Sequence, residues 1–176
     1  MGLLLAIDTA ATRLQLALLA EDGSGETLVE DMATGQAERL FPALESLLAR
    51  KGGAYADLSR IAVTTGPGSF TGLRIGLSAA RGLGLALGIP VLGIPSLLAL
   101  SLVARCEPLA VLLDARRGEA YFQAFSGPAI PVRPAALLPM EDARQRVPQG
   151  ATVVTSPLVD ILALARFAAT ADPAAF

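Results

Sequence analysis

The chain has 176 residues, of which 53% are hydrophobic and 17% charged, and its formal net charge is −2. This composition predicts a globular protein with one large core or two smaller lobes, and it excludes a basic surface that binds nucleic acid by charge alone. With no histidine and one cysteine, the sequence also excludes a Ser-His-Asp or Cys-His catalytic centre, a histidine zinc site and an internal disulfide, and it is typical of a reducing compartment, by default the cytoplasm.

The N-terminal part of the chain predicts a hairpin, a third strand and a helix. An apolar run at residues 3–7 predicts a buried strand, and leucines at every second position over 14–18 predict a strand that runs back beside it. A third strand is expected at 26–31 and a helix at about 37–51, where apolar residues recur with helical spacing. Pro42 is expected in the first turn of this helix, where the missing backbone N–H of proline is tolerated.

Five further elements are expected in the middle of the chain: a strand at 60–65, a glycine-rich loop at 66–72, a helix at 73–87, a strand at 91–94 and a helix at 96–104. The run from residue 82 to 104 contains no charged residue and is long enough to span a membrane. Pro90 and Pro95 divide that run into a helix, a strand and a helix. No membrane-spanning segment is therefore expected.

Small residues follow one side of the helix expected at 73–87. They recur at every fourth position and leave a ridge with almost no side chains: Gly72, Gly76, Ala80, Gly84 and Gly88. Each helical glycine costs about 0.5–1 kcal/mol relative to alanine, so a close neighbour must pack on the ridge. The rest of the helix is mostly apolar, which predicts cover on two sides. One side should contact the helix's own sheet, and the pattern leaves open whether the other side contacts the second lobe or a partner chain.

The second half of the sequence resembles the first. An apolar strand at 109–113 ends at Asp114, a turn at 115–118 follows, and a strand at 119–125 runs back. Four more elements are expected after it: a strand at 130–133, a helix at 141–146, a strand at 152–155 and a helix at 158–168. Together these elements predict an α/β fold of two lobes, residues 1–105 and a smaller lobe at 106–176, each a mixed sheet with flanking helices.

Two acidic residues and the glycine-rich loop suggest a nucleotide or anion site. Asp8 and Asp114 each end an apolar strand, where actin-like phosphotransferases keep acidic groups around a nucleotide-bound metal. The loop GPGSFTG joins a strand to a helix, so its backbone N–H groups could face an anion. The candidate residues of this vestigial site are Asp8, Thr9, Gly68, Ser69, Thr71 and Asp114.

Simpler interpretations of the same residues remain open. In one of them, both carboxylates only accept hydrogen bonds from turn amides, as aspartates commonly do. The loop is not a Walker loop, because no Lys-Ser/Thr follows Gly72, and a structural loop capped by Ser69 or Thr71 is the better interpretation. Cys106 has no visible base beside it, so a core or edge residue is expected and not a nucleophile.

Three stretches resemble one known family. LLLAIDTA at residues 3–10, TTGPGSFTGLRIGLSAARGLGLALGIPVLGIPSL at 64–97 and LLDARRGEAYF at 112–122 closely resemble the TsaB family, also called YeaZ. The resemblance implies duplicated lobes of the actin, sugar kinase and Hsp70 type, which is RNase H-like. It also implies a non-catalytic scaffold and dimerisation subunit for threonylcarbamoyladenosine modification of tRNA.

The same resemblance implies the partners. They are the catalytic subunit TsaD, the ATPase TsaE, tRNA reached indirectly through the complex, and a second copy of the chain when it is alone; it implies no cofactor except ATP or ADP at a subunit interface. TsaD binds metal through two histidines on its first helix, whereas the corresponding segment here, 36–40, contains none. Family members often carry an inherited glycoprotease or peptidase label, which the absence of histidine makes a poor description of this chain.

In the TsaB family the first two helices hold the second copy or TsaD. That relation places nine residues at or near a partner interface: Leu40, Phe41, Leu44, Leu73, Arg74, Gly76, Leu77, Ala80 and Arg81. The alternative function is an actin-like, ATP-dependent small-molecule kinase, which would use Asp8, Asp114 and the GPGSFTG loop.

Overall fold

The chain forms two compact units in the computed structural model, which describes residues 2–103 and 107–176. The first unit contains residues 1–94 and 161–176, and the second contains 95–160. These bounds differ from the lobes expected at 1–105 and 106–176, because the last helix of the chain packs on the first sheet. Cys106 lies outside the described residues.

The first unit is built on a five-stranded mixed sheet. Its strands are β1 (Leu3–Asp8), β2 (Arg13–Ala20), β3 (Gly25–Asp31), β4 (Leu58–Thr64) and β5 (Val91–Ile94). They lie in the order β3-β2-β1-β4-β5; β2 is antiparallel to both β1 and β3, while β4 is parallel to β1 and to β5. Every residue of β1 is buried, which requires cover on both faces of the sheet.

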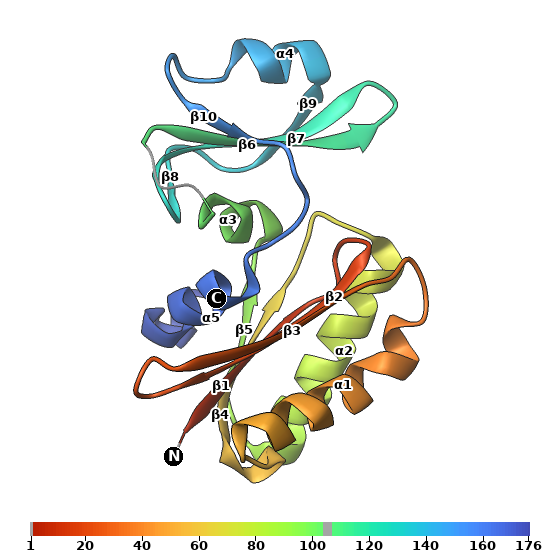
Figure 1. Ribbon diagram of the computed structural model, residues 1–176. Coiled ribbons are helices and arrows are strands. Elements are labelled where there is room, and N and C mark those ends of the chain that lie inside the picture. Colours follow the sequence, from red (N-terminus) through yellow and green to blue (C-terminus); the bar gives the residue numbers. More distant parts are fainter. Residues whose placement is uncertain (1, 104–106) are drawn as a thin grey trace. The chain divides into compact units, whose positions relative to one another are not determined.

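Helices supply that cover (Figure 1). Two long helices, α1 (Gln36–Lys51) and α2 (Phe70–Leu87), pack on one face, where the alternate β1 residues Leu3, Leu5 and Ile7 join their core. The other face is covered by α5 (Ile161–Thr170), which packs on β1 and β2. Arg60 of β4 fixes the end of α5, because its guanidinium donates to the carbonyl oxygens of Ala168 at 2.7 Å and Ala171 at 3.1 Å. Two short 3-10 helices, η1 (Tyr55–Asp57) and η2 (Pro173–Ala175), complete the unit.

The second unit repeats the strand pattern with less helix. Its strands are β6 (Leu109–Arg116), β7 (Glu119–Gly127), β8 (Ile130–Pro131), β9 (Ala136–Pro139) and β10 (Thr152–Val154). The order is β10-β6-β7-β8, and β9 also pairs with β7; β6 is antiparallel to β7 and parallel to β10. The two helices, α3 (Ser96–Ser101) and α4 (Met140–Gln145), lie on opposite faces of this sheet (Figure 1).

The α/β fold class with two mixed sheets is confirmed. The expected position of Pro42 is wrong: α1 begins at Gln36, and the proline lies inside the helix beyond its first turn. Its side chain is exposed there, so the lost backbone hydrogen bond is on the solvent side. Strand β9 was not expected, and α2 begins at Phe70 instead of residue 73. Among the described residues, no helix combines the length and the apolar character needed to cross a membrane.

Candidate functional site

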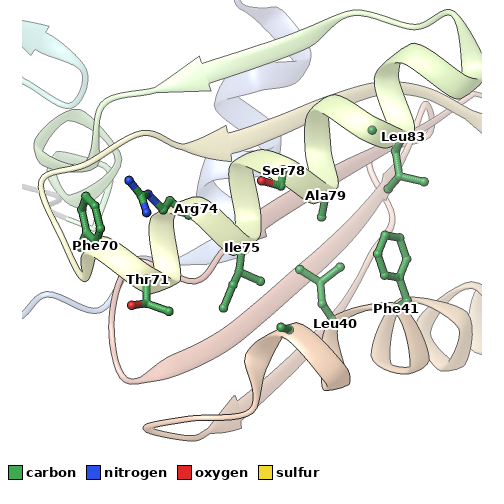
Figure 2. Close-up of a pocket in the computed structure, with 11 residues that line it drawn as sticks. Leu40, Phe41, Phe70, Thr71, Arg74, Ile75, Ser78, Ala79 and Leu83 are labelled. Atoms are coloured by element: carbon green, nitrogen blue, oxygen red, sulfur yellow. The ribbon is translucent and has the colours of Figure 1, made fainter.

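A groove of about 600 Å³ lies between α1 and α2 of the first unit. Figure 2 shows Leu40 and Phe41 of α1 across from Ile75 and Leu83 of α2, with Arg74 beside Phe70 at one edge. Its lining residues are mostly apolar: Ala37, Leu40, Phe41, Phe70, Thr71, Arg74, Ile75, Ser78, Ala79, Gly82 and Leu83. A groove of this kind, between two helices and open to solvent, suits a protein segment.

The small-residue ridge of α2 does not face this groove. A Cβ atom on Gly72 would lie 1.9 Å from the carbonyl oxygen of Thr9, and one on Gly76 would lie 2.6 Å from the Thr9 hydroxyl oxygen. The glycines therefore let α2 approach the turn after β1 and the sheet beneath it. The ridge thus contacts the helix's own sheet, which is the cover expected for one side of α2. The cover of the other side, by the second lobe or by a partner chain, stays a prediction.

The residues predicted at the interface differ in their burial. Leu40, Leu44, Gly76 and Ala80 are buried in the first unit, although Leu40 also forms part of the floor of the groove. Phe41, Arg74 and Arg81 are exposed, while Leu73 and Leu77 are half-buried. Only Leu40, Phe41 and Arg74 of the nine line the groove.

Phe70 is the largest groove residue that the sequence interpretation missed. It is 68% exposed, and the Arg74 guanidinium carbon lies 3.8 Å from the centre of its ring. A cation–π contact at an exposed site contributes about 0.5–1 kcal/mol, enough to hold the two side chains together on one edge of the groove. Phe70 was assigned to the loop because the helix was expected to begin at residue 73. Extending the helix by one turn brings Phe70 and Arg74 to neighbouring positions four residues apart.

An ion pair fixes α1, and with it one wall of the groove. Arg39 donates from Nε to Glu30 Oε2 at 2.8 Å and from Nη2 to Glu30 Oε1 at 2.5 Å. This hydrogen bonding lowers the pKa of the Glu30 carboxyl and raises the pKa of the Arg39 guanidinium. The pair joins α1 to β3 on the solvent side of the unit.

Asp8 is buried and its carboxylate is engaged within the first unit. Oδ1 accepts hydrogen bonds from the Thr64 hydroxyl at 2.6 Å and from the Ala10 backbone N–H at 3.2 Å, while Oδ2 accepts from Gln15 Nε2 at 3.0 Å. Two strands and a turn are joined through this one side chain. These contacts agree with the simpler interpretation of Asp8 as a residue that bonds a turn amide.

The glycine-rich loop is bonded to the turn that follows β1. Ser69 N–H donates to the Ala10 carbonyl at 2.7 Å, the Thr9 hydroxyl donates to the Gly72 carbonyl at 2.7 Å, and Gly72 N–H donates to the Ser69 hydroxyl at 3.2 Å. Ser69 is thus the N-cap of α2; the sequence left the choice between Ser69 and Thr71. Gly68 also approaches Ala10 closely, and the side chain of Thr71 lines the groove instead. The proposed anion site in this loop stays a prediction.

Asp114 belongs to the second unit and has a different setting. It is exposed, and its Oδ1 accepts a hydrogen bond from Arg116 N–H at 2.7 Å. It lies on the face of its sheet that carries α4, together with Leu112. Asp8 lies on the face of its sheet away from α1 and α2, because the alternate residues Leu3, Leu5 and Ile7 face those two helices. The two carboxylates therefore share a local turn motif without occupying equivalent positions in their sheets. Among the described residues, no group of three or more acidic or cysteine side chains is placed to hold a metal ion.

The chain has clear relatives among known proteins. A family model described as TsaD, tRNA N6-adenosine threonylcarbamoyltransferase, matches residues 30–127. The tRNA threonylcarbamoyladenosine biosynthesis protein TsaB of Bacillus subtilis is 39% identical over 120 residues, which cover 67% of this chain and 52% of that protein. TsaB of Escherichia coli is 33% identical over 123 residues, covering 68% of this chain and 53% of that protein. The chain thus spans about half the length of the curated relatives it matches.

A solved structure agrees over nearly the whole chain. YeaZ from Pseudomonas aeruginosa superposes with a TM-score of 0.82 at 29% identity, covering 96% of this chain and 91% of that chain. The agreement includes both units, so the arrangement of strands and helices within each unit is the one found in YeaZ.

Proposed function

The chain belongs to the TsaB (YeaZ) family of tRNA threonylcarbamoyladenosine biosynthesis, and on this premise we propose that it is a non-catalytic subunit that docks on the catalytic subunit TsaD through the groove between α1 and α2. The observation that carries the proposal is the groove itself, an apolar depression edged by two exposed phenylalanines, Phe41 and Phe70. Aromatic side chains at the edge of an apolar groove are typical anchors of protein interfaces.

The composition of the groove favours a protein occupant. Phe41, Ile75 and Leu83 line it with exposed or half-buried apolar side chains, and an amphipathic helix laid between α1 and α2 would cover all three. Contiguous apolar patches that are exposed on a folded protein usually mark an interaction site.

Charge around the groove supports self-association when TsaD is absent. Glu38 and Glu45 neighbour Phe41 on the exposed side of α1, while Arg74 and Arg81 lie on the exposed side of α2. In a dimer with two-fold symmetry, these two glutamates of one copy would lie opposite the two arginines of the other. The same surface would then serve either a second copy or TsaD, and TsaE and tRNA would join through the complex in the cytoplasm.

A matched pair of variants tests the docking surface. Phe41→Glu combined with Phe70→Glu places two carboxylates at the edge of the groove, and we expect it to weaken binding to co-expressed TsaD by about two orders of magnitude, because buried charges cost several kcal/mol. Leu85→Glu is the control, since Leu85 is 88% exposed on the same helix and does not line the groove. Light scattering after size-exclusion chromatography measures the complex. If the double variant elutes with TsaD as the wild type does, the groove is not the docking site.

The kinase alternative has a separate test. The Asp8 carboxylate already accepts three hydrogen bonds, which leaves it a poor candidate to hold a hydrated metal. Titration calorimetry of the isolated protein with ATP and Mg²⁺ decides between the two functions. Binding followed by turnover would support a kinase and contradict a purely non-catalytic role.

A further inference from the structure

The second unit has a hollow of about 520 Å³ that the proposed function does not use. It lies beside α4 and over the face of β6 and β10. Its apolar lining consists of Leu112, Met140, Val147 and Val153, and two charged residues, Asp114 and Arg144, stand at its edge.

In the first unit, which has the same strand pattern, a helix covers the corresponding part of the sheet. There, β1 is antiparallel to β2 and parallel to β4, and α2 packs on β4 and β1 beside α1. In the second unit, β6 is antiparallel to β7 and parallel to β10, and α4 takes the place of α1. No helix of the described residues 107–160 takes the place of α2, because the chain leaves β10 through residues 155–160 without forming one. The hollow therefore lies where the first unit has its second helix.

The burial of two valines shows the consequence. Val63 of β4 faces α2 and is 1% exposed. Val153 of β10 pairs with Ala110, which shares the α4 side with Leu112, and it is 43% exposed. An apolar sheet face that is covered in one unit is thus open to solvent in the other.

We propose that this hollow binds an amphipathic helix of another protein, laid over β6 and β10 in the way that α2 lies over β1 and β4. The apolar side of that helix should carry small residues, since α2 reaches its sheet through Gly72 and Gly76. Its edge should carry a carboxylate opposite Arg144 and none opposite Asp114, because the exposed Arg144 guanidinium has no ion-pair partner among the described residues and the Asp114 carboxylate would repel a second one.

Two synthetic peptides test the proposal on the full chain. Both are alanine-rich amphipathic helices with an apolar side of alanine, glycine and leucine, and they differ only in a glutamate or a lysine at the edge. Fluorescence anisotropy should show the glutamate peptide binding about 3- to 5-fold more tightly than the lysine peptide, the range expected for one exposed ion pair. Arg144→Glu should reverse this order.

A pair of valine variants locates the binding. Val153→Asp should weaken both peptides by at least about 10-fold, because it places a charge under the apolar side of the helix. Val29→Asp is the control, since Val29 is 47% exposed on β3 of the other sheet, and it should change nothing. Equal effects of the two substitutions, or no binding by either peptide at about 1 mM, would overturn the proposal. Sedimentation of the protein alone provides the remaining check: a dimer that Val153→Asp abolishes would assign the hollow to a second copy and also overturn it.

Discussion

The two units share a strand pattern and differ in how much helix covers it. The first sheet lies between α1 and α2, of 16 and 18 residues, and α5 on its other face. The second sheet has α3 and α4, each of 6 residues, on its two faces. As a result β1 is buried throughout its length, while Val153 of β10 is 43% exposed.

The two units therefore expose different kinds of surface. The first unit carries the larger core, and its outer helices form the groove proposed to bind TsaD. The second unit has a smaller core and leaves part of its sheet open. We therefore expect the stability of the protein to depend mainly on the first unit. The first three predictions below each contrast a covered position with an open one.

The largest effect is expected where α2 approaches the turn after β1. Gly72→Ala should lower the free energy of unfolding by about 3 kcal/mol, because the new methyl group meets backbone and neither side can move freely. Gly82→Ala is the contrast, since a Cβ there has no neighbour within 4 Å; it should raise the free energy of unfolding by about 0.5–1 kcal/mol. Urea denaturation measures both. Equal effects would mean that the close approach of α2 does not hold the unit together.

The two aspartates provide the second contrast. Asp8→Asn should destabilise the protein by about 2–3 kcal/mol, because an amide group cannot accept all the hydrogen bonds that the buried carboxylate accepts. Asp114→Asn should change the free energy of unfolding by less than about 0.5 kcal/mol, since its side chain is exposed. Thermal unfolding followed by circular dichroism checks this pair. A large effect of Asp114→Asn would indicate a structural role that its contacts do not explain.

The third prediction tests the two valines of the parallel strands. Val63→Ala removes buried methyl groups under α2 and should cost about 1.5–2 kcal/mol. Val153→Ala should cost less than about 0.5 kcal/mol in the free protein, because the side chain is already in contact with water. Chemical denaturation of both variants gives the comparison, and similar losses would show that the open face contributes to stability by itself.

The smallest effect concerns the ion pair between Glu30 and Arg39. Because the contact lowers the folded-state pKa of Glu30 from its ordinary value of 4.5, the carboxylate stabilises the fold above that value, and the contribution is lost as the pH falls through the lowered pKa. Glu30→Gln should lower the melting temperature by no more than about 2–3 °C at pH 7, because the pair is exposed to solvent. The difference from the wild type should shrink as the pH is lowered toward 3. A difference that is independent of pH would mean that the charge of Glu30 is not its source.

Much of the fold could be predicted from local pattern. Alternating leucines predicted β2, the helical spacing over 37–51 predicted α1, and Ser69 was one of two expected caps of α2. Strand β9 was missed because it pairs with β7 across a proline-rich connection, and such a pairing leaves no periodic signal in so short a segment.

The sequence by itself determined the fold class, the family, and the absence of histidine chemistry, because these depend on residue identity and on spacing along the chain. Tertiary structure alone decided which neighbour covers each face: the glycine side of α2 contacts its own sheet, Leu44 lies in the core, and Phe70 stands at the groove. It also placed Asp8 and Asp114 on different faces of their sheets. Periodicity shows which residues of a helix or strand share a face, but the segments that pack on that face are distant in sequence. In a strand, a one-residue difference in register also moves every side chain to the opposite face of the sheet.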